Sequence, residues 1–259
     1  MPKAGELTYL SALSDGRKEH AENKPFSDTG AGHLFADLGM MRMLLHDPPG
    51  RVLDLGCGTG WTSCFLAKMG YEVVGQDIAP DMIKSAIINK QRYEAHSANF
   101  VVSDYESMAY ENEFDGACFF DSLHHAEDER LALEAVFRAL KPGGVVVTHE
   151  PGKGHSKHED SIHAVEEYGV TEKDMPPSHI MQIGAEIGYS KARYFPFPRD
   201  VMNMLMRTKP QSLASQRGGM IGRIGSGLWT FGARLHTLKR LFKVVNSAVD
   251  RGGLVVLTK

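Results

Sequence analysis

Four residues in the stretch VLDLGCGTGW have the types and spacing of a nucleotide-binding turn. Asp54, Gly56, Gly58 and Gly60 occupy alternate positions directly after an apolar run and before a helical pattern. Glycines let the chain turn sharply and let a ligand approach the backbone, and the next helix offers unpaired N–H groups. The spacing argues against two other nucleotide sites. A dinucleotide fold needs glycine where Trp61 stands, and the phosphate loop of nucleotide hydrolases needs a lysine that GTGWTS lacks.

Two acidic residues at the ends of later apolar runs could complete such a site. Asp77 follows the second run, 21 residues after Gly56. A carboxylate there can accept hydrogen bonds from both hydroxyls of an adenosine ribose, and we favour this role over a solvated strand end. Asp104 ends the third run, where it could accept from an adenine amino group or cap the helical turn that follows. Both interpretations of Asp104 stay open, with adenine slightly preferred.

Polar residues after the fourth and fifth apolar runs are candidates for catalysis. Reacting groups in open α/β sheets lie beyond the carboxyl ends of the strands. This rule selects Asp121, His124 and His125, and then His149 and Glu150. A positioned histidine or carboxylate can remove the proton of an acceptor hydroxyl, so His124 or His149 is a candidate general base. Either histidine could instead order a loop, and Glu150 could hold an acceptor or simply end its strand.

These candidates need a sheet that brings them to one edge. Short apolar runs rich in Val and Phe alternate with helical patterns, as in repeated βα units of a parallel sheet. The expected strands are 51–55, 72–76, 99–103, 114–120, 145–148, 192–197 and 254–257. The expected helices are 59–69, 80–91 and 128–140, the last with Leu131, Ala135 and Leu140 on its inner side.

The rest of the chain divides into a cap and an insertion. Residues 1–50 form the expected helical cap over the site, with Leu34, Leu38, Met41 and Leu45 at helical spacing. Residues 51–200 form the core and 251–259 its final strand. Between them, 201–250 is a basic insertion, with eight Lys or Arg residues and no acidic residue from 201 to 249. Within it, 228–245 predicts an amphipathic helix that packs as a lid or subunit contact, or lies on an anionic membrane.

The ordered motifs VLDLGCGTG, VVGQD, the SD pair, FDGACFFDSLHH and LKPGGVVVTHEP resemble those of class I S-adenosylmethionine-dependent methyltransferases. The resemblance covers about residues 50–152. It implies a Rossmann-like, mostly parallel seven-stranded sheet with helices on both faces and an antiparallel last strand. It also implies S-adenosylmethionine as cofactor, with Asp54 and Gly56–Gly60 (Cys57 included) at the methionine part, Asp77 at the ribose, and Ile78 and Asp104 at the adenine. We expect further cofactor contacts from Trp61, Met82, Ser103, Tyr105 and Asp121.

Composition and the remaining motifs restrict the compartment and the functions that are possible. The formal net charge is −3, and three cysteines without CxxC spacing favour a reducing compartment. With no apolar leader or membrane-length run, we expect a cytoplasmic protein. Residues 154–163 contain His155, His158 and His163, but their spacing does not place them on one helical face, so we expect no metal site.

The fourth run ends in FFDSL, without the motifs of DNA-base methylation, so we expect no nucleic-acid substrate. The leading hypothesis is methyl transfer to a small-molecule acceptor, oxygen being favoured over nitrogen, with a sugar or lipid-linked metabolite as one candidate. The alternative is a regulatory subunit that binds S-adenosylmethionine without catalysis. The sequence does not indicate an oligomeric state.

Overall fold

The computed structural model describes residues 3–206 and 250–259. Seven strands form a sheet in the order β3-β2-β1-β4-β5-β7-β6. The strands are β1 (Arg51–Leu55), β2 (Glu72–Asp77), β3 (Ala98–Val102), β4 (Phe114–Phe120), β5 (Leu140–Pro151), β6 (Lys191–Phe195) and β7 (Gly252–Thr258). Strands β1 to β5 pair in parallel, whereas β7 runs antiparallel to both of its neighbours. The predicted seven-stranded, mostly parallel sheet with an antiparallel last strand is confirmed.

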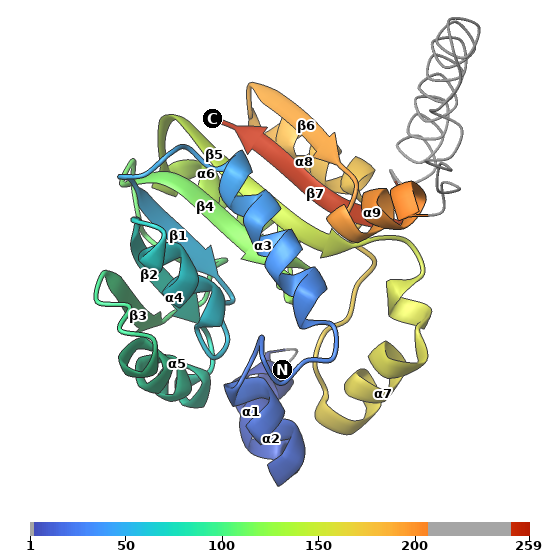
Figure 1. Cartoon of the computed structure of the whole chain (residues 1–259). Helices are drawn as coiled ribbons and strands as arrows, with labels where there is room; N and C mark the ends of the chain where they lie inside the picture. The colour runs from blue at the N-terminus through green and yellow to red at the C-terminus, as the bar shows by residue number, and fades with distance from the viewer. Residues whose placement is uncertain (1–2, 207–249) are drawn as a thin grey trace, which may run out of the picture.

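Helices cover both faces of this sheet (Figure 1). They are α1 (Ala4–Ala12), α2 (Asp15–Glu22), α3 (Ala31–Leu44), α4 (Trp61–Lys68), α5 (Pro80–Arg92), α6 (Glu129–Ala139), α7 (Glu159–Tyr168), α8 (Pro177–Ile187) and α9 (Pro198–Met206), with 3-10 turns η1 (Leu123–His125) and η2 (His155–Lys157). Helices α6 and α8 pack on one face with Leu53 and Val146, and α3 and α4 pack on the other with Val52 and Val147. Successive strand residues thus enter opposite cores, which explains the unbroken apolar runs.

Strand β5 is longer than the sequence predicted. We expected residues 145–148, but the strand runs from Leu140 to Pro151. The reason is β7, which pairs with β5 as far as Glu150↔Gly253 and Pro151↔Gly252. His149 and Glu150 therefore lie inside a paired strand, and the expectation that they follow its end was wrong.

Helix α6 faces the core with other residues than predicted. Ala135 is buried as expected, but Leu131 is 46% exposed and Leu140 already belongs to β5. The Asp128 side chain accepts from the N–H groups of Arg130 and Leu131 and so starts the helix at Glu129. This start turns Leu131 toward solvent and aligns the face that bears Ala132, Ala135, Val136 and Ala139 with the sheet.

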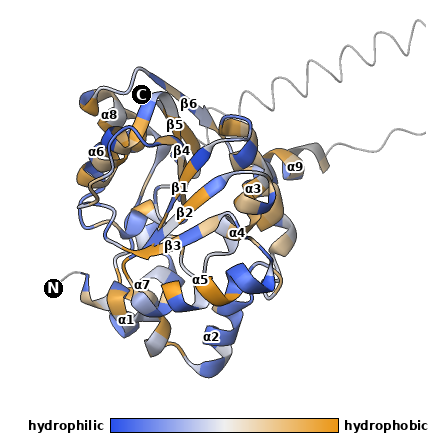
Figure 2. Ribbon diagram, turned by 90° about the vertical axis from the view of Figure 1, so that its left-hand side faces the viewer, coloured by the Kyte–Doolittle hydropathy of each residue, from blue (hydrophilic) through white to orange (hydrophobic). Residues whose placement is uncertain are grey.

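The N-terminal segment forms helices that gather beyond the sheet edge. Helix α3 buries Leu38 and Met41, and Leu45 follows as its C-cap, as the spacing predicted. Helices α1, α2 and α7 lie beyond the carboxyl ends of β1 and β4 (Figure 1). Helix α2 has no buried residue and is hydrophilic (Figure 2). Its end is tied to α5, because the Asn89 amide donates to the Glu22 carbonyl at 3.1 Å.

The predicted amphipathic helix at 228–245 lies outside the described residues, and the division of the chain into cap, core and insertion stays a prediction. Among the described residues, no helix combines the length and apolar character needed to cross a bilayer.

Candidate cofactor and acceptor site

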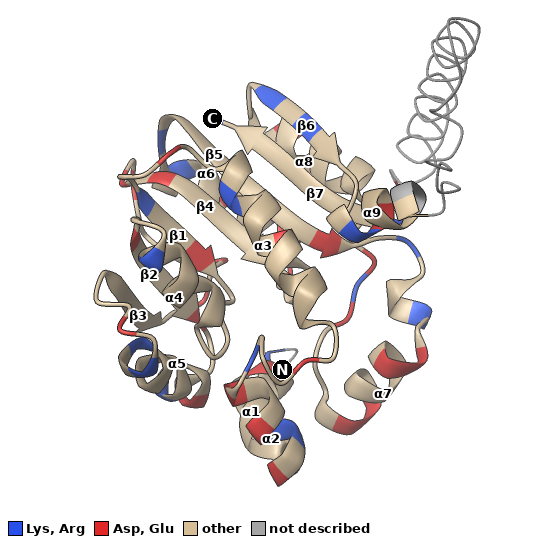
Figure 3. Ribbon diagram, viewed as in Figure 1, with Lys and Arg blue, Asp and Glu red and all other residues tan. Residues whose placement is uncertain are grey.

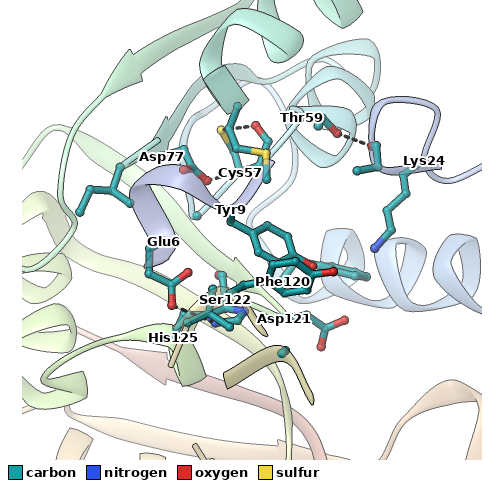
Figure 4. Close-up of a pocket in the computed structure, with 18 of the residues that line it drawn as sticks. Glu6, Tyr9, Lys24, Cys57, Thr59, Asp77, Phe120, Asp121, Ser122 and His125 are labelled. Carbon is teal, nitrogen blue, oxygen red and sulfur yellow. Dashed lines mark hydrogen bonds and ion pairs between the residues drawn. The ribbon is translucent and has the colours of Figure 1, made fainter. Parts of the chain in front are cut away.

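A cavity of about 750 Å³ opens at the carboxyl ends of β1, β2 and β4, between the glycine turn and the helices α1, α2 and α7 (Figure 4). Ten of the predicted cofactor residues line it: Gly56, Cys57, Gly58, Trp61, Asp77, Ile78, Met82, Asp104, Tyr105 and Asp121. Asp54, Gly60 and Ser103 do not. The structure thus brings ten of the thirteen predicted cofactor residues together around one cavity.

The glycine turn is shaped by two positions that exclude a side chain. Gly56 has φ +66°, and a Cβ there would lie 2.6 Å from the Ser122 Cβ. Gly60 has φ +77°, and a Cβ there would lie 2.7 Å from the Ala86 Cβ and 2.8 Å from Phe100 Cζ. Both positions therefore require glycine, because the end of β4 and helix α5 leave no room for a side chain there.

Asp54 supports the turn rather than the cavity. Its side chain is buried and accepts from the hydroxyls of Thr62 and Ser63 at 2.6 and 2.5 Å. Burial raises the pKa of Asp54, and these two hydroxyls offset part of that rise. The carboxyl group thus joins β1 to the first turn of α4.

Asp77 is placed to hold both the turn and a ligand. One oxygen accepts from the Gly58 N–H and the other from the Ala79 N–H, each at 2.9 Å. Burial raises the pKa of Asp77, and these two N–H bonds oppose the rise. A carboxylate has about four acceptor positions. Each oxygen of Asp77 can therefore still accept from a ribose hydroxyl, so the residue fits the role the sequence proposed.

Asp104 caps the turn that follows β3, which is one of the two roles considered for it. Its Oδ1 accepts from the Glu106 N–H at 3.0 Å, which caps the turn after β3. Its Oδ2 pairs with the Lys3 ammonium, which also lies 3.0 Å from Glu106. The structure thus brings a donor from the N-terminal segment to the carboxylate that we assigned to the adenine amino group.

The three predicted catalytic residues do not line the cavity. Glu150 is fully buried and accepts from the N–H groups of Ser122, Leu123 and His124. It also lies 2.7 Å from His124 Nδ1. His149 stacks on Phe120 with the ring centroids 4.5 Å apart. These contacts order the β4 end, and the geometry does not support direct contact with a reacting group.

Buried His149 forms an ion pair with Asp121, whose side chain is half exposed at the cavity. His149 Nδ1 lies 3.0 Å from Asp121 Oδ1, and its Nε2 lies 3.3 Å from Asp37 without hydrogen-bond alignment. Burial alone would lower the pKa of His149, but the two carboxylates outweigh it and raise the pKa to about 10. Burial would raise the pKa of Asp121, yet His149 holds it at about 2. Asp121 has φ +50°, a strained backbone that aims it into the cavity.

Sequence reasoning selected His125 but missed Glu6 and Glu172, which form one wall of the cavity with it. His125 Nδ1 donates to the Thr171 carbonyl at 2.6 Å and lies 3.5 Å from Glu6 Oε1 (Figure 4). Burial alone would lower the pKa of His125, but Glu6 and Glu172 raise it to about 9. No motif spacing connects residues 6, 125 and 172, so only the fold reveals this group.

The charge of the cavity favours a cationic ligand. Seven acidic and three basic residues line it, and α7, at one side, is strongly acidic (Figure 3). The sulfonium of S-adenosylmethionine is such a cation. The bare turn, the free acceptor positions of Asp77 and this charge balance all fit that cofactor.

The fold and site define the class: a Rossmann-like domain with a glycine turn at the carboxyl end of β1. Residues 53–148 match the family described as methyltransferase domain. The chain is 33% identical over 101 residues to the ubiquinone biosynthesis O-methyltransferase of Xanthomonas campestris pv. campestris. The aligned stretch is 38% of this chain and 42% of the relative. It is 36% identical over 101 residues to the S-adenosyl-L-methionine-dependent Diels-Alderase iccD of Talaromyces variabilis. That aligned stretch is 36% of this chain and 34% of the relative.

Solved structures agree on the fold. Phosphoethanolamine N-methyltransferase 2 of Haemonchus contortus, in complex with S-adenosyl-L-methionine, superposes with a TM-score of 0.56 at 19% identity, over 88% of this chain and 51% of that one. An S-adenosylmethionine-dependent methyltransferase from Mesorhizobium loti superposes with a TM-score of 0.55 at 16% identity, over 86% of this chain and 96% of that one. Residues 53–148 of this chain therefore form a methyltransferase domain of the class I type, whose methyl donor is S-adenosylmethionine. The chain spans less than half the length of the two curated relatives named above.

Proposed function

We propose that this protein transfers the methyl group of S-adenosylmethionine to an oxygen atom of a small-molecule acceptor. The observation that carries the proposal is the cavity itself, in which the adenosyl-binding turn and Asp77 share one space with a wall of aromatic and cationic residues. Its volume of about 750 Å³ is within the range of small-molecule sites. The three cysteines are buried free thiols, which fits the proposed cytoplasmic location.

The cofactor supplies a methyl carbon that its sulfonium already activates. The residues of the chain must therefore mainly bind and orient the two ligands. On the cofactor side, Asp77 and Asp104 hold the nucleoside, and the acidic lining favours the positive charge. On the acceptor side, Tyr9 and Phe120 provide flat apolar surface.

Three cationic side chains on the acceptor side support oxygen over nitrogen, although the cavity as a whole is acidic. With a pKa of about 9, His125 carries a proton at neutral pH and can donate from Nε2 to a ligand. Lys24 and Arg17 also line the cavity. These cations stabilise an acceptor oxygen that bears negative charge, such as a phenolate or carboxylate, and would repel a protonated amine. The ubiquinone biosynthesis relative, an O-methyltransferase by name, supports the same choice.

The second candidate is a protein that binds S-adenosylmethionine without transferring its methyl group, as in the regulatory subunit considered above. Two observations favour it. His124, His149 and Glu150 do not line the cavity, and one relative is named a Diels-Alderase, an activity that is cycloaddition rather than methylation.

A product assay separates the candidates. The full chain is incubated with S-adenosylmethionine and a panel of phenols, carboxylic acids and amines, and S-adenosylhomocysteine and methylated products are measured by mass spectrometry. We expect turnover with phenols or carboxylic acids. Turnover with amines alone would contradict O-methylation, and cofactor binding without any turnover across the panel would favour the second candidate.

A further inference from the structure

A cluster of histidines and a glutamate lies at one end of the cavity. Single ligand atoms of His124, His125 and Glu172 all lie within 4.8 Å of one another. His155 joins the cluster, with its Nε2 2.6 Å from Glu172 Oε2. The histidines come from η1 and η2, after β4 and β5, and Glu172 comes from the segment between α7 and α8. The fold thus gathers four residues that the sequence separates.

The histidine rings are oriented as they are in protein metal sites. His124 Nδ1 lies 2.7 Å from the Glu150 carboxylate, and His125 Nδ1 lies 2.6 Å from the Thr171 carbonyl. A metal-binding histidine commonly donates one ring N–H to a carboxylate or carbonyl and presents the other nitrogen to the ion. Here Nε2 is the presented nitrogen, and that of His124 lies 3.6 Å from Glu172 Oε2. An ion bound at His125 Nε2 would displace the proton that this nitrogen carries in the metal-free chain, and would itself supply the positive charge there.

We propose that His124, His125 and Glu172, with His155, bind a divalent transition-metal ion of the zinc type. Zinc bonds of about 2.0–2.1 Å place tetrahedral ligand atoms roughly 3.4 Å apart, so the cluster needs side-chain shifts of about 1 Å. Imidazole-rich sites suit zinc, cobalt or nickel, whereas magnesium and calcium prefer oxygen ligands. The carboxylate of Glu6, 3.5 Å from His125, adds negative charge next to the ion.

This site was not expected from the sequence, in which we considered His155, His158 and His163 for a metal and expected no site. The structure separates these three. His158 lies 3.5 Å from Asp160, His163 lies 2.5 Å from Glu167, and only His155 turns to Glu172. The other two ligands come from the LHH stretch, which we had considered for acid–base catalysis.

The ion would lie at the cavity wall, because both His125 and Glu172 line the cavity. A divalent ion there can lower the pKa of a bound acceptor hydroxyl. That role rests on the proposed function, whereas metal binding does not, since it is measured without S-adenosylmethionine or acceptor.

The test is metal titration of the full chain after EDTA treatment and gel filtration. Zn²⁺ binding is followed by calorimetry and Co²⁺ binding by its visible absorption. We expect one ion per chain, and a loss of affinity of at least tenfold in Glu172→Gln and in His155→Gln. The matched control is His163→Gln, which changes a cavity-lining histidine outside the cluster and should leave the affinity unchanged.

Two results would overturn the proposal. One is the absence of stoichiometric Zn²⁺ and Co²⁺ binding by the native chain. The other is equal affinity in the native chain, Glu172→Gln, His155→Gln and His163→Gln, which would place the ion on surface histidines. His155 is 25% exposed in its side chain, so His155→Gln keeps the test decisive if circular dichroism shows that Glu172→Gln is misfolded. Methyl transfer by the EDTA-treated chain is assayed separately, so failure of metal binding is distinguishable from failure of the proposed function.

Discussion

Replacing Glu150 by glutamine tests whether this residue is structural. The carboxylate is fully buried and accepts at 3.1 and 2.7 Å from the N–H groups of Ser122 and Leu123 on one oxygen. The other oxygen lies 3.3 Å from the His124 N–H and 2.7 Å from its Nδ1. Glutamine keeps the shape, but it turns one acceptor oxygen into a donor and removes the charge.

The expected loss follows from these four contacts. The His124 N–H loses its acceptor, which costs about 1–3 kcal/mol for a buried donor, and two charge-assisted bonds become neutral ones at about 1 kcal/mol each. The free energy of unfolding should therefore fall by about 3–5 kcal/mol. For a chain of this size that is a fall in Tm of roughly 6–20 °C.

Urea denaturation followed by circular dichroism measures this loss, with the exposed Glu166→Gln on α7 as control. The control should stay within about 0.5 kcal/mol of the native chain. A stable Glu150→Gln variant, within 1 kcal/mol of native, that bound S-adenosylmethionine yet had lost turnover would refute the structural role and restore the catalytic one.

Two further predictions follow from the turn and the ion pair. Gly60→Ala forces a Cβ to within 2.8 Å of Ala86 and Phe100 at φ +77°, so it should cost about 2–5 kcal/mol in urea denaturation. Gly16→Ala, in open space, is its control; equal stability of the two variants would contradict the close packing. The His149 pKa rises from 6.5 to about 10 on folding, so its stabilisation is complete below pH 6.5 and lost toward pH 10. His149→Gln should remove that decline in stability, and an unchanged decline would disprove the ion pair's contribution.

Much of the fold was predictable because local patterns determine it. Apolar runs buried on both faces mark parallel strands, and the bare positions at Gly56 and Gly60 mark a turn that neighbouring elements approach closely. Local sequence patterns do not determine where a strand or helix ends. The length of β5 depends on pairing with β7, about a hundred residues later in the chain, and this pairing turned His149 and Glu150 from presumed strand-end groups into buried ones.

The candidate site was predictable on the cofactor side only. The turn and Asp77 belong to one compact motif, whose residue spacing can be recognised in a single sequence. Glu6, His125 and Glu172 come to the cavity from three separate segments, and no periodicity connects them. Helix α1 carries an ordinary polar and apolar mixture, so the sequence could suggest a cap but not which of its residues would enter the cavity.

The most direct test of the account is calorimetric titration of the native chain and of Asp77→Asn with S-adenosylmethionine and, separately, with NAD. Asparagine retains the shape but replaces one oxygen that accepts from the Gly58 or Ala79 N–H and that we propose accepts from the ribose. We predict one S-adenosylmethionine site per chain, at least tenfold weaker binding in Asp77→Asn, unchanged binding in the Asp81→Asn control, and no heat with NAD. Saturable binding of NAD alone, or equal affinity of native and Asp77→Asn chains for S-adenosylmethionine, would contradict the account.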